Sequence, residues 1–96
     1  MKKWDTILHF DEWLALPEEK KRERLTPQCR RVLEFVDMNG SINPMQALTE
    51  IGVMRLAARI DDLEWMGWHF DHTPTKGVNR YGEKTRYMTY SYKKVA

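Results

Sequence analysis

Residues 41–60, SINPMQALTEIGVMRLAARI, decide the fold. Asn43 precedes Pro44 and stands three residues before Gln46, which is the spacing of a helix N-cap with a capping box. Gly52 can adopt the positive φ that ends a helix. The pattern therefore predicts a short helix, followed by a tight turn. We expect its inner face to consist of Ala47, Leu48 and Ile51.

Two further helices flank this segment. Upstream, Thr26 is a plausible N-cap, Pro27 suits the first helical position, and Asn39-Gly40 ends the helix. Apolar residues recur at helical spacing within it, at Cys29, Val32, Leu33 and Val36. Downstream, a helix is predicted from about residue 54 to residue 66, with an inner stripe of Leu56, Ala57, Ile60 and Leu63.

After Gly67 the apolar period changes from helical spacing to two, which is typical of a strand. The first strand is expected to end before Pro74, and a loop rich in Pro, Gly and Asn is expected from residue 74 to residue 84. A second alternating stretch places four side chains on one side of the chain, namely Arg86, Met88, Tyr90 and Tyr92. We therefore predict a β-hairpin with a basic loop.

The first 25 residues are interpreted as a helical N-terminal arm, which leaves residues 26–96 as the main domain. The arm carries an apolar, aromatic cluster and then a charged run from Glu18 to Arg24. We expect the charged run to be a solvated helix face. The cluster is expected to pack on the rest of the domain. A contact with a protein partner or a second copy of the chain is the alternative, through Trp4, Phe10 and Trp13.

Positive charge is concentrated at the end of this 96-residue chain, whose total formal charge is only +2. Between Lys76 and Lys94 six basic residues face a single acidic one, Glu83, which gives this segment a net charge of +5. A field of one sign at one end of a small domain suits a polyanionic partner. No apolar run approaches the roughly 18 residues of a membrane span, and the single cysteine, Cys29, fits a reducing cytoplasm.

The order helix, short extended bridge, helix, turn, helix, hairpin resembles the winged helix-turn-helix domain, and in particular the small DNA-binding domains of phage and prophage proteins. The resemblance covers about residues 26–92. Its most specific parts are the segment through Ile60 quoted above and two later short motifs, Asn79-Arg80-Tyr81-Gly82 and Lys84-Thr85-Arg86. It implies an α+β fold, a three-helix core with a β-hairpin wing, and a cytoplasmic regulator of transcription, in a bacterial host, that binds double-stranded DNA.

The resemblance also implies which residues contact DNA. The third helix enters the major groove, where Arg55 and Arg59 share one flank and can bind guanine. Ala58 allows close approach, and Met54 or Ala58 can meet a thymine methyl group. The wing lies on phosphates or in the minor groove through Lys76, Asn79, Arg80, Tyr81, Lys84 and Arg86. Ser41 and Asn43, at a helix start, add phosphate donors.

Catalysis finds little support in the sequence, which contains no phosphate-binding Gly-rich loop and no metalloprotease motif. His69 and His72 fall on opposite faces of an alternating strand, so we expect no zinc site, and no cofactor is predicted. A protein-interaction module of the same fold remains the alternative function. It would bind a host or phage protein through the aromatic arm or the Tyr-rich hairpin.

Overall fold

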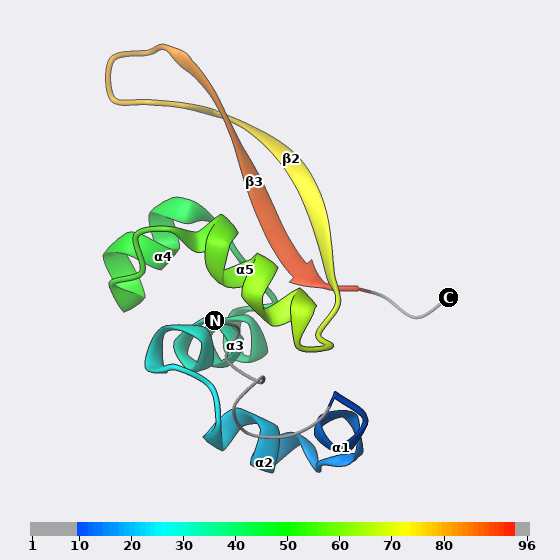
Figure 1. The fold of residues 1–96 in the computed structure, drawn as a ribbon. Coiled ribbons are helices and arrows are strands. Elements are labelled where there is room, and N and C mark those ends of the chain that lie inside the picture. Colours follow the sequence, from blue (N-terminus) through cyan, green and yellow to red (C-terminus); the bar gives the residue numbers. More distant parts are fainter. Residues whose placement is uncertain (1–9, 94–96) are drawn as a thin grey trace.

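The computed structural model describes residues 10–93, with side chains from residue 12 onward. Five helices precede a hairpin: α1 (Phe10–Ala15), α2 (Glu18–Glu23), α3 (Pro27–Asn39), α4 (Pro44–Ile51) and α5 (Leu56–Trp65). The strands are β1 (Ser41–Ile42), β2 (Phe70–Val78) and β3 (Lys84–Tyr92), which form an antiparallel sheet in the order β1-β3-β2. Figure 1 shows α3, α4 and α5 grouped below a long, twisted hairpin whose tip extends away from the helices.

The predicted helix boundaries around α3 and α4 are confirmed. The Thr26 side chain accepts a hydrogen bond from the backbone N–H of Cys29, and Gly40 adopts a φ of 85° at the end of α3. Asn43 and Gln46 form the reciprocal capping box at the start of α4. These signals act within one turn of helix, so the fold leaves them unchanged.

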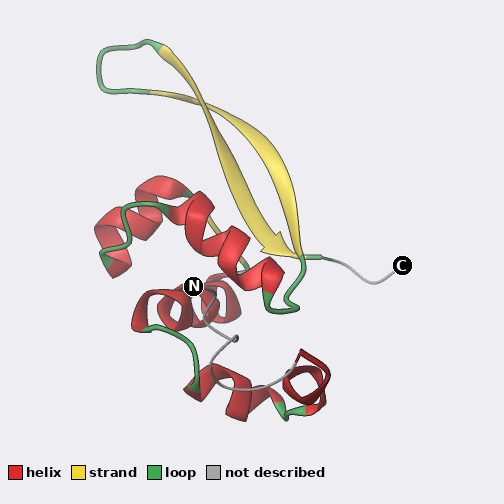
Figure 2. Cartoon of the chain, viewed as in Figure 1, coloured by secondary structure: helices red, strands yellow, loops and turns green. Residues whose placement is uncertain are grey.

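The start of α5 and the extent of the hairpin differ from the prediction. Residues 54 and 55 precede α5, because Arg55 has non-helical angles (φ −118°, ψ 68°) and is the N-cap of the helix. The N–H of Val53 bonds to the carbonyl of Ala47 and so closes the end of α4. The predicted loop from residue 74 to residue 84 is wrong, since β2 continues through Pro74 to Val78. β2 is an edge strand, where a proline that cannot donate a ladder hydrogen bond is tolerated. Figure 2 shows the turn between the two strands as a short loop.

One hydrophobic core joins the helices to the base of the sheet. It contains the predicted stripes of α3 and α5, together with Ile42, Val53 and Tyr90. The prediction for α4 is only partly right, because Ala47 is buried whereas Leu48 is 49% exposed. The prediction for Ala57 is wrong, because its side chain is exposed on the outer side of α5.

The described part of the N-terminal arm shares this core. The Trp13 side chain is 1% exposed, its indole Nε1 donates a 2.6 Å hydrogen bond to the carbonyl of Met66, and its ring meets Trp68 edge-on. Leu25, at the end of the arm, is also buried in the core. The division of the chain into an arm and a main domain at residue 25 stays a prediction. The buried side chains of Trp13 and Leu25 link the arm to the main domain.

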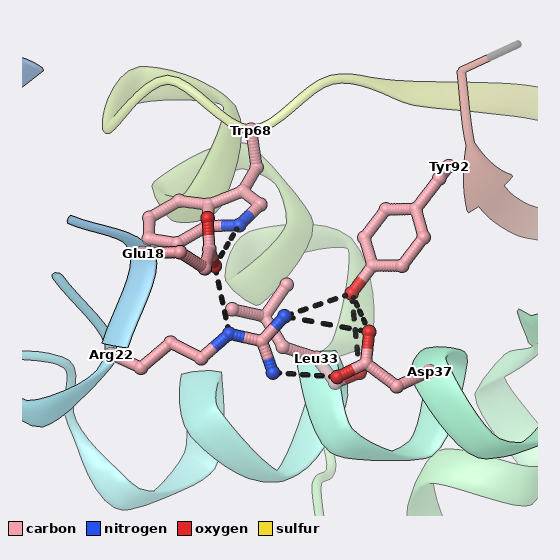
Figure 3. Close-up of polar contacts among 6 residues, drawn as sticks. All are labelled: Glu18, Arg22, Leu33, Asp37, Trp68 and Tyr92. Carbon is pink, nitrogen blue, oxygen red and sulfur yellow. Dashed lines mark hydrogen bonds and ion pairs between the residues drawn. The ribbon is translucent and has the colours of Figure 1, made fainter. Parts of the chain in front are cut away.

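A polar cluster fastens α2 to α3 and to the end of β3 (Figure 3). Arg22 bonds Glu18 through Nε (2.7 Å) and Asp37 through Nη1 (2.6 Å), and the hydroxyl of Tyr92 donates to Asp37 (2.6 Å). The hydrogen bond from Arg22 holds the pKa of Asp37 below its usual range. Burial, followed by the hydrogen bond to Asp37, raises the pKa of Tyr92 above its usual range.

These two shifts predict a stability plateau. The contribution of Asp37 is present above its unfolded pKa of about 4 and is lost as the pH falls through its lower folded value. The contribution of Tyr92 is present below about pH 10 and is lost as the pH rises through its higher folded value. We expect Asp37→Asn to cost at most about 1 kcal/mol near neutral pH, because the Asp37 side chain is 38% exposed.

Urea titrations of wild type and Asp37→Asn at several pH values measure this dependence. The difference between their unfolding free energies should shrink as the pH falls below about 4. Glu34→Gln, which removes an exposed carboxylate one turn earlier on α3, is the matched control and should show a smaller difference. A difference between wild type and Asp37→Asn that stays constant from pH 7 to pH 2 would contradict the assignment.

Candidate nucleic-acid interface

The outward face of α5 carries small side chains in its first turn and the 49% exposed Trp65 at its end. Its inner stripe, Leu56, Ile60 and Leu63, is buried in the core. Ala57 and Asp61 are exposed on the other side and Ala58 is half-buried. Side chains at successive positions of a helix point about 100° apart, which puts these three on one outward face. Two alanines at the first turn let another molecule come close to the helix backbone.

One flank of α5 faces the start of α3 and is basic. Arg59 donates from Nη1 to the side-chain carbonyl of Gln28 (3.1 Å), and its Nε lies 3.1 Å from a carboxylate oxygen of Asp62. A groove at this flank is lined by Thr26, Pro27, Gln28, Arg31 and Arg59. A guanidinium has five N–H donors, more than these two contacts use, so Arg59 is held in place with donors to spare.

Gln28 and Arg31 are absent from the sequence-based assignment. They are three residues apart and therefore share one face of α3. That face joins the candidate interface because α5 packs beside it and places Arg59 next to both residues. Arg59 and Asp62 are three residues apart on α5, a spacing that allows an ion pair within one helix, and the structure contains it.

The other flank of α5 faces the hairpin. The Glu64 carboxylate lies 3.0 Å from Nε2 of His72 on β2, within hydrogen-bond distance, and the ring of His72 meets Tyr90 edge-on. Burial, and to a lesser degree the carboxylate of Glu64, raises the pKa of Tyr90. The exposed face of α5 therefore lies between a basic flank on α3 and the proximal part of the hairpin.

Arg55 and Met54 stand just before α5, at the turn that leads into it. Met54 is 82% exposed and Arg55 is also exposed. The carbonyl of Arg55 accepts the hydrogen bond of the Arg59 N–H, so Arg55 is the N-cap of the helix. The prediction that both arginines are helical residues one turn apart is thus wrong for Arg55, which precedes α5, whereas Arg59 lies in the first turn of the helix.

Three cations share one face of the hairpin beyond the core. Lys76 lies directly opposite Arg86, and Lys84 is two residues before Arg86 on β3. Opposite residues, and alternate residues of one strand, project from the same side of a sheet. All three are exposed. Like charges directly opposite one another destabilise a strand pair, and a bound polyanion would remove that repulsion.

The turn at the tip is built by Asn79. Its side-chain oxygen accepts hydrogen bonds from the N–H groups of Tyr81 (2.9 Å) and Glu83 (3.0 Å), and its amide donates to the Glu83 carboxylate (3.1 Å). The structure thus gives Asn79 a turn-forming role. Arg80 and Tyr81 are exposed beside it, with the guanidinium 5.9 Å from the centre of the Tyr81 ring.

The start of α4 lies next to the distal hairpin. A groove there is lined by Asn43, Pro44 and Met45 on one side and by hairpin residues including Val78, Arg86 and Tyr87 on the other. The Asn43 side chain is occupied by the capping box, and Ser41 pairs with Ser91 in the sheet. Asn43 and Ser41, the predicted phosphate donors, therefore also have structural roles, in the cap of α4 and in the pairing of β1 with β3.

Trp13 packs in the core beside Met66 and Trp68, as expected for the aromatic cluster, so the alternative of a partner contact is wrong for this residue. Trp4 and the side chain of Phe10 lie outside the described residues. Within residues 10–93, no helix is long and apolar enough to traverse a bilayer. The same part of the chain contains no group of three or more His, Cys, Asp or Glu side chains that could bind a metal ion.

The three-helix core, the turn between α4 and α5, and the antiparallel hairpin define a winged helix-turn-helix protein, in which α4 and α5 are the two helices of the helix-turn-helix. The chain belongs to the winged helix-turn-helix domain family, whose model matches residues 27–95. No curated protein and no solved structure matches it. The α+β fold predicted from the sequence is confirmed.

Proposed function

We propose that this chain is a non-enzymatic protein that binds double-stranded DNA, with α5 in the major groove and the hairpin on the adjacent phosphates or minor groove. The observation that carries the proposal is the arrangement around α5. Its small outward face has Arg59 and Arg31 on one side and the hairpin on the other. A major groove is bordered by a phosphate strand on each side, so Arg59 and Arg31 suit one strand and the exposed cations of the distal hairpin suit the other.

The family membership supports DNA as the partner. The resemblance to small phage and prophage proteins adds a finer hypothesis, that the protein regulates transcription in the bacterial cytoplasm. In this proposal Lys76, Lys84 and Arg86 contact phosphates, while Arg80 and Tyr81 reach furthest from the helices. Arg55 reads bases from the start of α5.

Fluorescence-anisotropy titration with a random duplex, at low and moderate salt, tests the proposal. Arg31→Ala/Arg59→Ala should weaken binding about 10- to 30-fold and lower the log–log salt slope by about two, because two phosphate contacts are lost. Circular dichroism verifies that the variant is folded.

The matched control is Lys20→Ala/Arg24→Ala, which removes the same charge from α2 and its C-cap. Figure 1 shows α2 on the opposite side of α3 from α5 and the hairpin. This control should bind nearly as wild type does. Equal behaviour of the two double variants would overturn the basic flank of α5 as a contact. Wild-type affinity too weak to measure at either salt would favour the protein-interaction alternative.

A further inference from the structure

The guanidinium of Arg59 has one hydrogen-bond partner within the described part of the chain, and that partner belongs to another helix. The side-chain carbonyl of Gln28 on α3 accepts from Nη1 at 3.1 Å. A carboxylate oxygen of Asp62 lies 3.1 Å from Nε, which is an ion-pair distance, but Nε makes no hydrogen bond and is buried. The hydrogen bond from Gln28 therefore sets the direction in which the guanidinium points.

The burial of Nε decides how another molecule can reach Arg59. The groove between the start of α3 and α5 is lined by this side chain, so a ligand there can approach only the Nη end of the guanidinium. That end offers both N–H groups of Nη2 and the second N–H of Nη1. A pair of such donors matches two oxygens of one phosphate group. The Gln28 contact thus leaves available the part of Arg59 that suits a phosphate.

Gln28 has a fixed backbone and an exposed side chain. It is the second residue of α3 and precedes Cys29, which is fully buried and whose N–H bonds to the Thr26 cap. The cap and the core therefore hold the backbone of Gln28, while its amide lies outside the core. Replacing this side chain removes the contact with Arg59 and leaves the packing of α3 intact.

We infer that Gln28 is a positioning residue that orients Arg59 in advance for a phosphate of the duplex, an inference that rests on the proposed DNA-binding function. An arginine side chain loses rotamer freedom when it binds, and holding it in one orientation beforehand lowers that cost. Without Gln28 the guanidinium is free to turn towards Asp62, whose carboxylate would then compete with the phosphate.

A double-mutant cycle, measured by fluorescence anisotropy with a random duplex, tests this inference. Gln28→Met keeps the length of the side chain but removes the acceptor, and should weaken binding about three- to tenfold in the otherwise wild-type protein. In the Arg59→Ala background the same substitution should change the affinity less than about twofold, because the side chain that it positions is gone. A loss of folding stability would instead weaken binding in both backgrounds.

Arg31→Ala is the matched control background. Arg31 lines the same groove and has the same charge, but no hydrogen bond joins it to Gln28 among the residues that the structure describes. Gln28→Met should therefore keep its three- to tenfold effect there. Three results would overturn the inference and leave the proposed function intact: no effect of Gln28→Met in wild type, a full effect with Arg59→Ala, or loss of the effect with Arg31→Ala as well. Failure of wild type to bind any duplex would overturn both.

Discussion

Replacing Trp13 with alanine should destabilise the protein by about 3–5 kcal/mol, the range typical of removing a large aromatic side chain from a core. Trp13 is 1% exposed and packs edge-on against Trp68, and its indole N–H satisfies the carbonyl of Met66 at the end of α5. The substitution would leave a cavity between α1 and the end of α5. For a small domain such a loss is a large part of the total stability.

A substitution series separates the two contributions of Trp13. Trp13→Phe keeps an aromatic ring but removes the N–H, and should cost about 1–3 kcal/mol because the Met66 carbonyl is left buried without its donor. Leu14→Ala, at the next position in α1 and 47% exposed, is the matched control and should cost less than about 1 kcal/mol. The measurement is urea unfolding followed by circular dichroism. A Trp13→Ala variant as stable as Leu14→Ala would show that the arm does not belong to the core.

What the sequence predicts well are features decided within a turn or two of chain. The Thr26 cap, the Asn43–Gln46 box, the apolar stripe of α3 and all of the α5 stripe except Ala57 depend on neighbouring residues, and each is present in the structure. Local signals fail where the partner is distant in sequence. The neighbouring residues alone predict a loop at Pro74. The strand continues through Pro74 because β2 lies at the edge of the sheet, where a residue without an N–H donor is tolerated.

The candidate interface shows the same limit. The helical wheel puts Arg55 and Arg59 on one flank, but Arg55 has non-helical angles and is the N-cap of α5. Arg31 and Gln28 join Arg59 only because α3 packs next to α5. The turn-forming role of Asn79 could not be predicted, because the sequence analysis placed the whole of residues 74–84 in a loop and so did not locate the tight turn.

Reversing the three hairpin cations should abolish most DNA binding. Lys76→Glu/Lys84→Glu/Arg86→Glu replaces three positive charges with three negative ones on a single face of the sheet. Loss of three charge-assisted phosphate contacts, with added repulsion, predicts a fall in affinity of about 10²- to 10³-fold at low salt. The control reverses three charges on α2, at Lys20, Lys21 and Arg24, on the far side of α3 (Figure 1). At ionic strength near 0.1 M, screening over about 10 Å should keep its effect within about fivefold.

The single variant Arg86→Glu distinguishes binding from stability. It converts the like-charged Lys76–Arg86 pair, directly opposite across the strands, into a pair of opposite charges. The hairpin should become more stable by about 0.2–1 kcal/mol, while affinity for a random duplex falls about tenfold or more. If the hairpin cations served only solubility, Arg86→Glu would stabilise the hairpin and leave the affinity for DNA unchanged. Because folding and binding move in opposite directions, impaired folding cannot explain the expected result, and unchanged affinity in the stabilised variant would remove the hairpin from the DNA interface.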